Sequence, residues 1–285
     1  MTFIMNLKVA DGIIIAGDST TTMNVEGPDG RLHPGMLFRG GNKIVNLVRG
    51  LPIGVSTFGL GAINGHSNEF LLKELRMRLM KPTSGFEEWV VDPTDFTMAS
   101  VAERTAEFVY QHNYLKQWEP PDRVAGAGAG FFLAGISSDQ LVGELYRIEI
   151  QADGSLVGPV LVSASDVQGG VIFDGMIEGP ARLFFGFSPF LMDVLVNHLG
   201  LAAEDVQGAA QILREQLMAG MITDAMPIQD AIDLSVFMVD VAIKWTRFTP
   251  QEETVGGAIE VATLTKHEGF KWVRRKHFYN RDLNP

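Results

Sequence analysis

The sequence of 285 residues contains no cysteine, and this absence excludes several kinds of chemistry. Disulfide scaffolds, cysteine-ligated zinc, iron–sulfur clusters and thiol catalysis all require cysteine. The 6 histidines show no HExxH or other metal-ligand spacing, so no metal site is expected among them. The sequence therefore predicts a protein whose activity uses no cofactor.

Positive charge is also scarce, because 23 Lys and Arg residues face 34 Asp and Glu residues and leave a net charge of −11. Nucleic-acid binding requires clustered basic residues, so no nucleic-acid partner is expected. One basic cluster, residues 271–277, is interleaved with apolar residues and predicts a terminal strand with a solvated face.

Long apolar runs are absent too. No stretch reaches the roughly 18 uninterrupted apolar residues of a membrane span, so no membrane partner is expected. The first fifteen residues include Asn6, Lys8 and Asp11, and they lack the basic-then-apolar order of a secretory signal. These features predict a cytoplasmic protein.

The composition that remains is typical of a globular protein, with 46% hydrophobic and 20% charged residues. Residues 3–17 predict two strands joined by a turn at Ala10-Asp11-Gly12. Apolar runs bounded by turn residues predict further strands at residues 43–48, 51–58, 131–135, 143–150, 157–163, 183–186, 257–265 and 270–275.

Apolar residues at helical spacing predict helices at residues 68–80, 101–118, 189–199 and 206–218 and after Pro227. Strands and helices are segregated along the chain, which favours an α+β class over alternating βαβ units. No repeat or linker is evident, so residues 1–285 are expected to form a single domain. Residues 20–42 predict a long polar loop, and both this segment and residues 81–100 are expected to be insertions.

Three residues carry a possible chemistry. If Met1 is removed, Thr2 has a free α-amine, whose ordinary pKa of about 7.7–8.0 leaves much of it neutral near pH 7. Such an amine can take the proton of the threonine's own hydroxyl, which makes Thr2 both nucleophile and base. Lys43 could supply a buried cation that favours the neutral amine, and Asp18 could orient that lysine.

The segments around these residues resemble a known family. The run TFIMNLK from Thr2, followed by DGIIIAGDS ending at Ser19, resembles the start of mature proteasome β subunits and of the related bacterial HslV. NKIV around Lys43, IGVSTFG ending at Gly59 and VGGAIEV starting at Val255 resemble later strands of that family. The resemblance covers the first 80 residues well and the last 60 loosely.

The resemblance implies an N-terminal-nucleophile (Ntn) hydrolase fold, a four-layer α-β-β-α sandwich of two packed, mostly antiparallel sheets flanked by helices. It implies that Thr2 attacks peptide (amide) bonds, with Lys43 and Asp18 in support. The backbone N–H of Gly59, or alternatively that of Gly61, would form the oxyanion hole. Ser188 is matched to a supporting serine of the family.

The resemblance also implies partners: a peptide or unfolded protein as substrate, and self-assembly into a homo-oligomeric ring or spiral. Whether an ATP-driven (ATPase) unfoldase acts with the chain stays open. The family places an Asp and a Ser before its Gly-Gly pair, whereas this sequence has Glu252 at the first position and Val255 at the second. An inactive proteasome-like structural or assembly subunit is therefore the alternative.

Two other motifs are weaker. The glycines of residues 59–65 lie between a strand and a helix, as in a dinucleotide site, but residues 81–85 offer no following strand. The serine in GFSPF, residues 186–190, lacks the second glycine of a hydrolase elbow and precedes a proline. Neither motif predicts a function.

Overall fold

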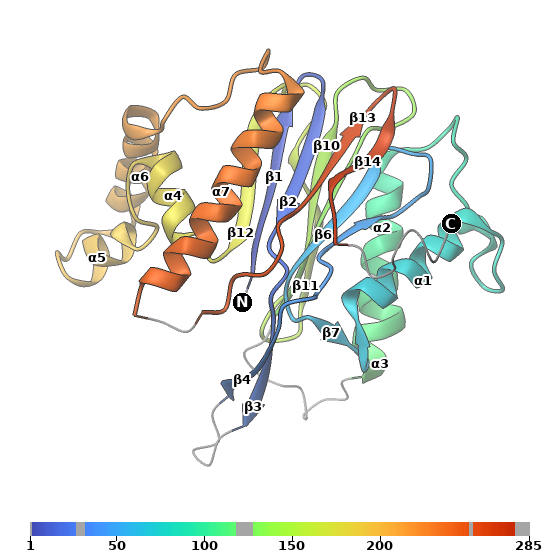
Figure 1. Cartoon of the computed structure of the whole chain (residues 1–285), viewed down its shortest axis with the longest axis horizontal. Coiled ribbons are helices and arrows are strands. Elements are labelled where there is room, and N and C mark those ends of the chain that lie inside the picture. Colours follow the sequence, from blue (N-terminus) through green and yellow to red (C-terminus); the bar gives the residue numbers. More distant parts are fainter. Residues whose placement is uncertain (1, 27–31, 118–127, 251–252, 277–285) are drawn as a thin grey trace.

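The computed structural model describes residues 2–26, 32–117, 128–250 and 253–276. Its main feature is a pair of five-stranded sheets (Figure 1). The first sheet has the order β12 (Gly170–Gly175), β1 (Phe3–Val9), β2 (Gly12–Gly17), β13 (Glu260–Thr265), β14 (Gly269–Arg274). The second has the order β11 (Leu156–Ser163), β10 (Glu144–Ile150), β9 (Ala129–Gly135), β6 (Ile53–Gly59), β5 (Ile44–Asn46). All neighbouring strands in both sheets are antiparallel.

The β1–β2 hairpin fixes the register of the first sheet. Val9 pairs with Gly12, so the turn contains only Ala10 and Asp11, while Gly12 of the predicted three-residue turn already belongs to β2. Every residue of both strands is buried, because side chains alternate between two covered faces. Phe3, Met5, Leu7 and Val9 contribute to one core cluster, whereas Ile4 contributes to another.

The two sheets contact each other through β6, which packs against β1, β12 and β14, and through β5, which packs against β2. The cluster between them takes apolar side chains from both sheets. Its buried members are Ile13, Ile15, Ile44, Ala134, Leu145, Ala262, Leu264 and Phe270. Burial of each large side chain contributes about 1.5–3 kcal/mol, so this layer joins the sheets firmly.

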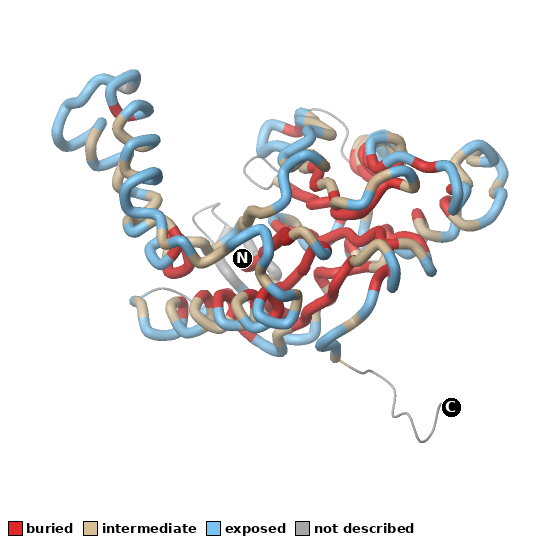
Figure 2. The backbone as a smooth tube through the Cα atoms, turned by 90° about the horizontal axis from the view of Figure 1, so that it is seen from above, coloured by how far each residue is buried: buried red, intermediate tan, exposed pale blue. Residues whose placement is uncertain are grey.

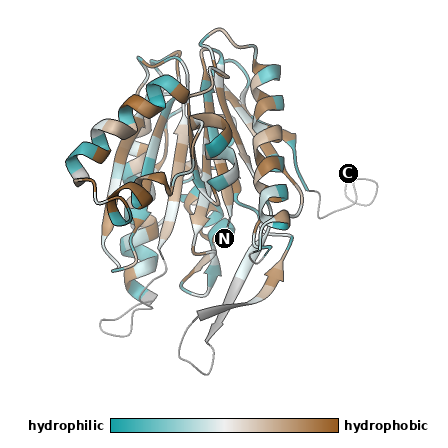
Figure 3. Ribbon diagram, turned by 90° about the vertical axis from the view of Figure 1, so that its left-hand side faces the viewer, coloured by the Kyte–Doolittle hydropathy of each residue, from teal (hydrophilic) through white to brown (hydrophobic). Residues whose placement is uncertain are grey.

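Helices cover the other face of each sheet. α1 (Asn68–Met80) contacts β5, and α2 (Met98–Val109) contacts β9, β10 and β11. α7 (Ile228–Phe248), the longest described helix, contacts β1, β2 and β13. Figure 3 shows the hydrophobic strands between helices on either side. Ser67 and Thr97 begin α1 and α2 as N-caps, because their hydroxyls accept the N–H of Phe70 and Ser100.

The helix predicted over residues 101–118 is not continuous. After α2 the chain forms a π-helical turn, Tyr110–Tyr114, and then the short α3 (Leu115–Gln117). A 3₁₀ turn, Glu87–Trp89, lies in the predicted insertion after α1.

Three further helices precede α7 in the chain. α4 (Glu178–Phe185) contacts α7, and α5 (Leu191–Asn197) and α6 (Ala203–Leu217) follow it. Figure 2 shows a helical projection to one side of the buried sheets, largely exposed along its length. The predicted strand at residues 183–186 is wrong, because this segment ends α4, and Gly186 caps the helix with a φ of 78°.

The predicted polar loop at residues 20–42 is wrong as well. This segment contains the antiparallel hairpin of β3 (Thr21–Glu26) and β4 (Leu32–Phe38), which extends below the rest of the molecule (Figure 3). Glycines and prolines suggested a loop, but the hairpin's bulge between Met23 and Asn24 accommodates the irregular sequence. A further small hairpin joins β7 (Ala62–Ile63) to β8 (His66–Ser67).

The structure is therefore a mixed α/β fold with several antiparallel sheets and helices, which is compatible with the predicted α+β class. Among the helices of the described residues, none has the length and apolar character needed to cross a membrane.

Candidate active site

Thr2 lies at the entry to β1, where the first sheet places it against the end of β12. Its carbonyl accepts the N–H of Met176 at 2.7 Å, and Phe3 pairs with Gly175. A side chain at Gly175 would meet the carbonyl of Thr2, so only glycine allows this close approach. Thr2 is 4% exposed, and its position is set by backbone contacts on both sides.

Asp18 follows β2 directly, and the hairpin register brings it to Thr2. Ile4 pairs with Gly17, so the next pair along is Phe3 and Asp18, whose N–H donates to the Phe3 carbonyl at 3.2 Å. The hydroxyl of Thr2 donates to Oδ1 of Asp18 at 2.8 Å. A contact between residues 16 positions apart thus results from the two-residue turn at the far end of the hairpin.

The Asp18 carboxylate accepts hydrogen bonds from five described donors. Oδ1 accepts from the Thr2 hydroxyl, the Phe3 N–H at 2.9 Å and the Lys43 ammonium at 2.5 Å. Oδ2 accepts from the N–H groups of Thr20 at 2.9 Å and Gly256 at 3.0 Å. A carboxylate offers about four lone-pair sites and no donor, so this fully buried group is saturated and fixed in orientation.

Lys43 immediately precedes β5 in the second sheet and reaches across to Asp18. It is 7% exposed, and its ion pair with Asp18 is the closest contact in the site. Burial lowers the pKa of the Lys43 ammonium, while the negative charge of Asp18 opposes that shift. A single carboxylate oxygen thus receives both the Thr2 hydroxyl and the Lys43 cation.

A second pair of charges lies beyond Lys43 and was not found from the sequence. Glu260 on β13 is 1% exposed, and Lys276 lies 3.9 Å from it and donates to the carbonyl of Gly41 at 2.6 Å. Lys276 lowers and Glu260 raises the pKa of Lys43, each by less than Asp18 does. These residues therefore adjust the charge around Lys43 without touching Thr2 in any described contact.

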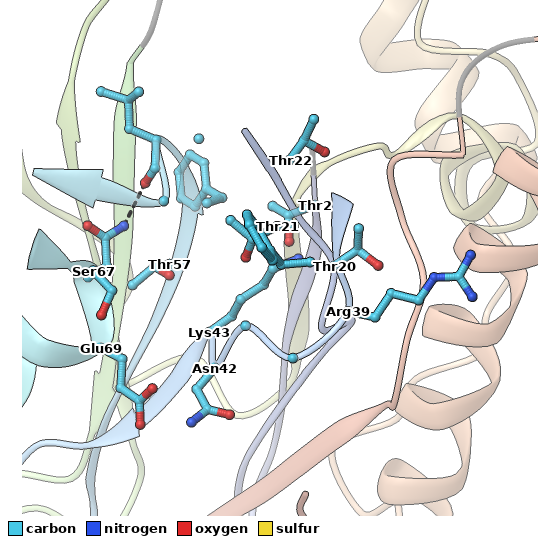
Figure 4. A pocket seen from close by; sticks show the side chains of 18 of the residues that line it. Thr2, Thr20, Thr21, Thr22, Arg39, Asn42, Lys43, Thr57, Ser67 and Glu69 are labelled. Carbon is cyan, nitrogen blue, oxygen red and sulfur yellow. Dashed lines mark hydrogen bonds between the residues drawn. The ribbon is translucent and has the colours of Figure 1, made fainter. Parts of the chain in front are cut away.

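Thr2 opens onto a pocket of about 730 Å³, here called the Thr2 pocket. Figure 4 shows Thr20, Thr21 and Thr22 on one side of Lys43 and Thr57, Ser67 and Glu69 on the other. Hydroxyl groups thus surround the cavity, and apolar side chains of Leu37, Phe38 and Phe58 complete it. A cavity of this size fits the range of about 300–1,000 Å³ typical of ligand pockets.

Gly59 borders the Thr2 pocket at the end of β6. Its φ is 76°, and an added Cβ would meet the carbonyl of Gly128 on the neighbouring segment, so glycine is required there. Gly61 lines the same pocket but, unlike Gly59, does not line the second cavity beside Thr2. Both predicted oxyanion-hole glycines therefore border the Thr2 pocket, and Gly59 also borders the second cavity.

The second cavity beside Thr2, about 270 Å³, is here called the Arg147 pocket. Arg147 bonds to Glu149 at 2.8 Å and to Asp174 at 2.9 Å. Burial raises the pKa of the Asp174 carboxyl, and Arg147 opposes that shift. The guanidinium also lies 5.1 Å from the centre of the Phe58 ring, so these charges sit against an apolar wall.

The structure thus brings Thr2, Asp18 and Lys43 together and places Gly59 beside them. It does not bring Ser188 to this site: the Ser188 hydroxyl donates to Glu178 at 2.7 Å, and Ser188 lines neither pocket beside Thr2. The match of Ser188 to a supporting serine is therefore wrong in position. Glu252 lies outside the described residues.

Sequence reasoning missed β12, whose last two residues, Asp174 and Gly175, lie against Thr2. The signal was present in the apolar run VIF within GVIFDG, but the strand is only partly buried and carries no longer apolar pattern. It also missed Gly256, whose N–H bonds to Asp18, although the Gly-Gly pair was noticed.

The described residues contain no cluster of three or more His, Asp or Glu side chains that could hold a metal. In comparisons with known proteins, no family model matches the sequence and no curated protein matches it significantly.

Proposed function

We propose that this chain is a threonine-type Ntn hydrolase that cleaves peptide (amide) bonds, with Thr2 as nucleophile after removal of Met1. The packing of two antiparallel sheets, with α7 on one outer face and α1 and α2 on the other, supports a four-layer α-β-β-α arrangement. Such an enzyme needs its nucleophile as the first residue, and removal of Met1 would give Thr2 that position at the entry to β1.

One observation carries the proposal: Oδ1 of Asp18 accepts both the Thr2 hydroxyl and the Lys43 ammonium, at the wall of a large pocket. A buried ion pair costs several kcal/mol of desolvation per charge and is often no more stable than an apolar packing. A structural role therefore explains it poorly. A nucleophile that must develop negative charge explains it well, since the cation then stabilises the alkoxide.

In the proposed reaction the free α-amine of Thr2 takes the hydroxyl proton, and Oγ1 attacks the substrate carbonyl carbon. The backbone N–H of Gly59 donates to the resulting oxyanion. The C–N bond then breaks, the proton passes to the leaving amine, and the acyl group remains as an ester on Thr2. Water hydrolyses this ester and restores the enzyme.

The Thr2 pocket supports an extended peptide or a segment of unfolded protein as substrate. β3 borders the pocket through Thr21 and Thr22, and the end of β6 borders it through Thr57 and Gly59. Strand edges of this kind can bind the backbone of an extended chain, while the cavity accepts one side chain.

We further propose that the chain works as a homo-oligomer, as a ring or spiral. α5, α6 and the segments next to them carry large apolar side chains that are exposed, including Phe190 at 61%, Leu199 at 68% and Ile212 at 61%. A concentration of such residues on one projection suits a contact between copies. Light scattering after size exclusion tests this point, and a monomer at micromolar concentration would contradict it.

A second candidate, an inactive structural or assembly subunit, is favoured by one observation. Val255 is fully buried in the core cluster beneath α7, and Ser188 bonds to Glu178. Val255 has no hydroxyl, and the hydroxyl of Ser188 is bonded to Glu178. The two positions matched to supporting serines of the family therefore offer no hydroxyl to Thr2.

Hydrolysis of a panel of fluorogenic peptides distinguishes the two candidates. Thr2→Ala is expected to lower the rate by roughly 10⁴-fold or more, because the nucleophilic hydroxyl is lost although the α-amine that acts as base remains. Thr2→Ser keeps both groups and is the matched control, with a rate well above that of the alanine variant. Equal rates for the wild type and Thr2→Ala would leave the structural role as the better account.

A further inference from the structure

A second polar cavity, about 200 Å³, lies where α1, β5 and the end of β14 meet, and is here called the basic pocket. Its lining includes Arg49, Lys73, Arg76 and Arg275 and, among the described residues, a single carboxylate, that of Glu69. Four cations therefore gather in a chain whose net charge is −11. No step of the proposed hydrolysis uses them.

The carboxylate does not neutralise this cluster. Glu69 pairs with Lys73 at 2.5 Å, one helical turn away on α1, which leaves the three arginines in excess. Burial lowers the pKa of Arg76, and the positive charges of Arg49 and Arg275 lower it further. Guanidinium groups that repel one another around a cavity are stabilised when an anion enters it.

Two of the arginines are already oriented. Nε of Arg76 donates to the carbonyl of Asn46 on β5 at 2.7 Å, which holds the side chain at the cavity wall. The guanidinium of Arg275 lies 4.9 Å from the centre of the Trp272 ring, which also lines the pocket. Orientation before binding lowers the entropy that a ligand contact must otherwise offset.

From this geometry we propose that the basic pocket binds a phosphate-type oxyanion through Arg49, Arg76 and Arg275. Planar guanidinium groups donate paired N–H bonds that match phosphate oxygens, and three of them suit an anion with more than one negative charge. The cavity is smaller than the roughly 300–1,000 Å³ of drug-sized sites, so it accommodates the phosphate group itself. That group belongs either to free phosphate or to a larger phosphorylated molecule.

The site is separate from the hydrolytic chemistry, although the two cavities are adjacent. Glu69 lines both the basic pocket and the Thr2 pocket, and β5 continues directly from Lys43. Binding of an anion needs no action of Thr2, so the full-length Thr2→Ala variant is expected to bind as the wild type does. Failure of one proposal therefore leaves the other intact.

Titration calorimetry of the full chain with inorganic phosphate tests the proposal, with chloride at matched ionic strength as the reference. The wild type is expected to bind one phosphate per chain, whereas Arg275→Gln is expected to weaken binding at least 10-fold. Arg49→Gln, at a second exposed position, is expected to do the same. Arg274→Gln is the matched control, because Arg274, the last residue of β14 and the neighbour of Arg275, is exposed and does not line the pocket.

Pyrophosphate and a nucleoside triphosphate identify the source of the phosphate. Binding of the nucleotide at least 10-fold more tightly than phosphate, lost in Arg275→Gln, would support the site and assign it to a larger molecule. Equal affinities would support it and assign it to the free ion. Heats no larger than those of chloride for all three probes, or equal losses in Arg274→Gln and Arg275→Gln, would overturn it.

Discussion

The Thr2 pocket and the basic pocket share Glu69 in their linings, yet their charges are arranged in different ways. In the first, Asp18 accepts five donors, and Lys43 is paired at 2.5 Å. In the second, the carboxylate of Glu69 is the only one in the described lining and is paired with Lys73, so the charges of Arg49, Arg76 and Arg275 are in excess.

The difference separates a buried, paired charge from a group of cations around an open cavity. A saturated ion pair holds its groups in one geometry before any ligand arrives, as catalysis requires. An unbalanced cluster keeps its capacity for a ligand of opposite charge. The comparison makes specific predictions, because removing one charge has different consequences in the two places.

Among these charge removals, loss of the Lys43 cation should have the largest effect on the rate of peptide hydrolysis. Lys43→Met is expected to lower peptide hydrolysis by roughly 10²–10⁴-fold, because the alkoxide and the neutral amine both lose their supporting charge. Arg274→Gln removes a cation that lines neither pocket and should leave the rate unchanged. Steady-state kinetics on one fluorogenic peptide compares the two variants, and a Lys43→Met rate within a factor of two of the wild type would contradict the account.

Removal of the Asp18 carboxylate, which accepts from both Thr2 and Lys43, should have the largest effect on stability. Asp18→Asn leaves the Lys43 charge buried without its partner, so the free energy of unfolding is expected to fall by about 3–5 kcal/mol in urea titrations. The double variant Asp18→Asn with Lys43→Met removes that unpaired charge and should recover part of the loss. Additive losses in the double variant would mean that the pair is not coupled.

Replacement of Glu260 should have a smaller, pH-dependent effect on the free energy of unfolding. Among the described residues neither of its carboxylate oxygens has a hydrogen-bond partner, and burial raises its pKa in the folded state. The folded state then binds the proton more tightly than the unfolded state, so stability falls as pH rises from the unfolded pKa to the folded pKa. The glutamine in Glu260→Gln stays neutral throughout. At pH 7 the free energy of unfolding of this variant should therefore be higher than that of the wild type, by on the order of 1 kcal/mol.

Urea unfolding at pH 4 and at pH 7 measures this difference. At pH 4 the glutamate is largely protonated in the folded state, so the gain from Glu260→Gln should shrink. Glu268→Gln, at an exposed position near the β13–β14 turn, is the matched control. A gain that is equal at both pH values would show that titration of Glu260 is not its cause.

The smallest effect is expected in the basic pocket without its ligand. Arg49→Gln removes one of the charges that repel Arg76, so the unfolding temperature should rise by about 1 °C in phosphate-free buffer of low ionic strength. High salt screens the repulsion and should abolish the gain, which differential scanning calorimetry can follow. A lower unfolding temperature for Arg49→Gln would instead mean that Arg49 makes a stabilising contact.

The residues differ in how far the sequence alone could place them. Asp18 was selected from the sequence as a partner of Lys43 and through the family resemblance. Its contact with Thr2 follows from the observed two-residue turn at Ala10-Asp11, which fixes the residues of the hairpin that face each other. Helix α1 was predicted with its observed bounds, because its apolar positions follow the helical period and Ser67 caps it.

Contacts between distant segments could not be predicted in this way. Arg49, Arg76 and Arg275 come from three elements, and only the packing of α1 and β14 around β5 brings them together. Asp174 and Gly175 were missed because β12 lies at the edge of its sheet and is only partly buried, which gives a weak apolar pattern. Ser188 was misplaced because a Gly-Phe-Ser sequence carries no information on where α4 ends relative to β1.

The most direct test of the central claim is the intact mass of the purified protein before and after exposure to an electrophile that captures N-terminal threonine. The account predicts a chain lacking Met1 that gains a single adduct, and no adduct on Thr2→Ala. A chain that retains Met1 and gains no adduct would contradict the proposed nucleophile, because the amine of Thr2 would then be held in a peptide bond.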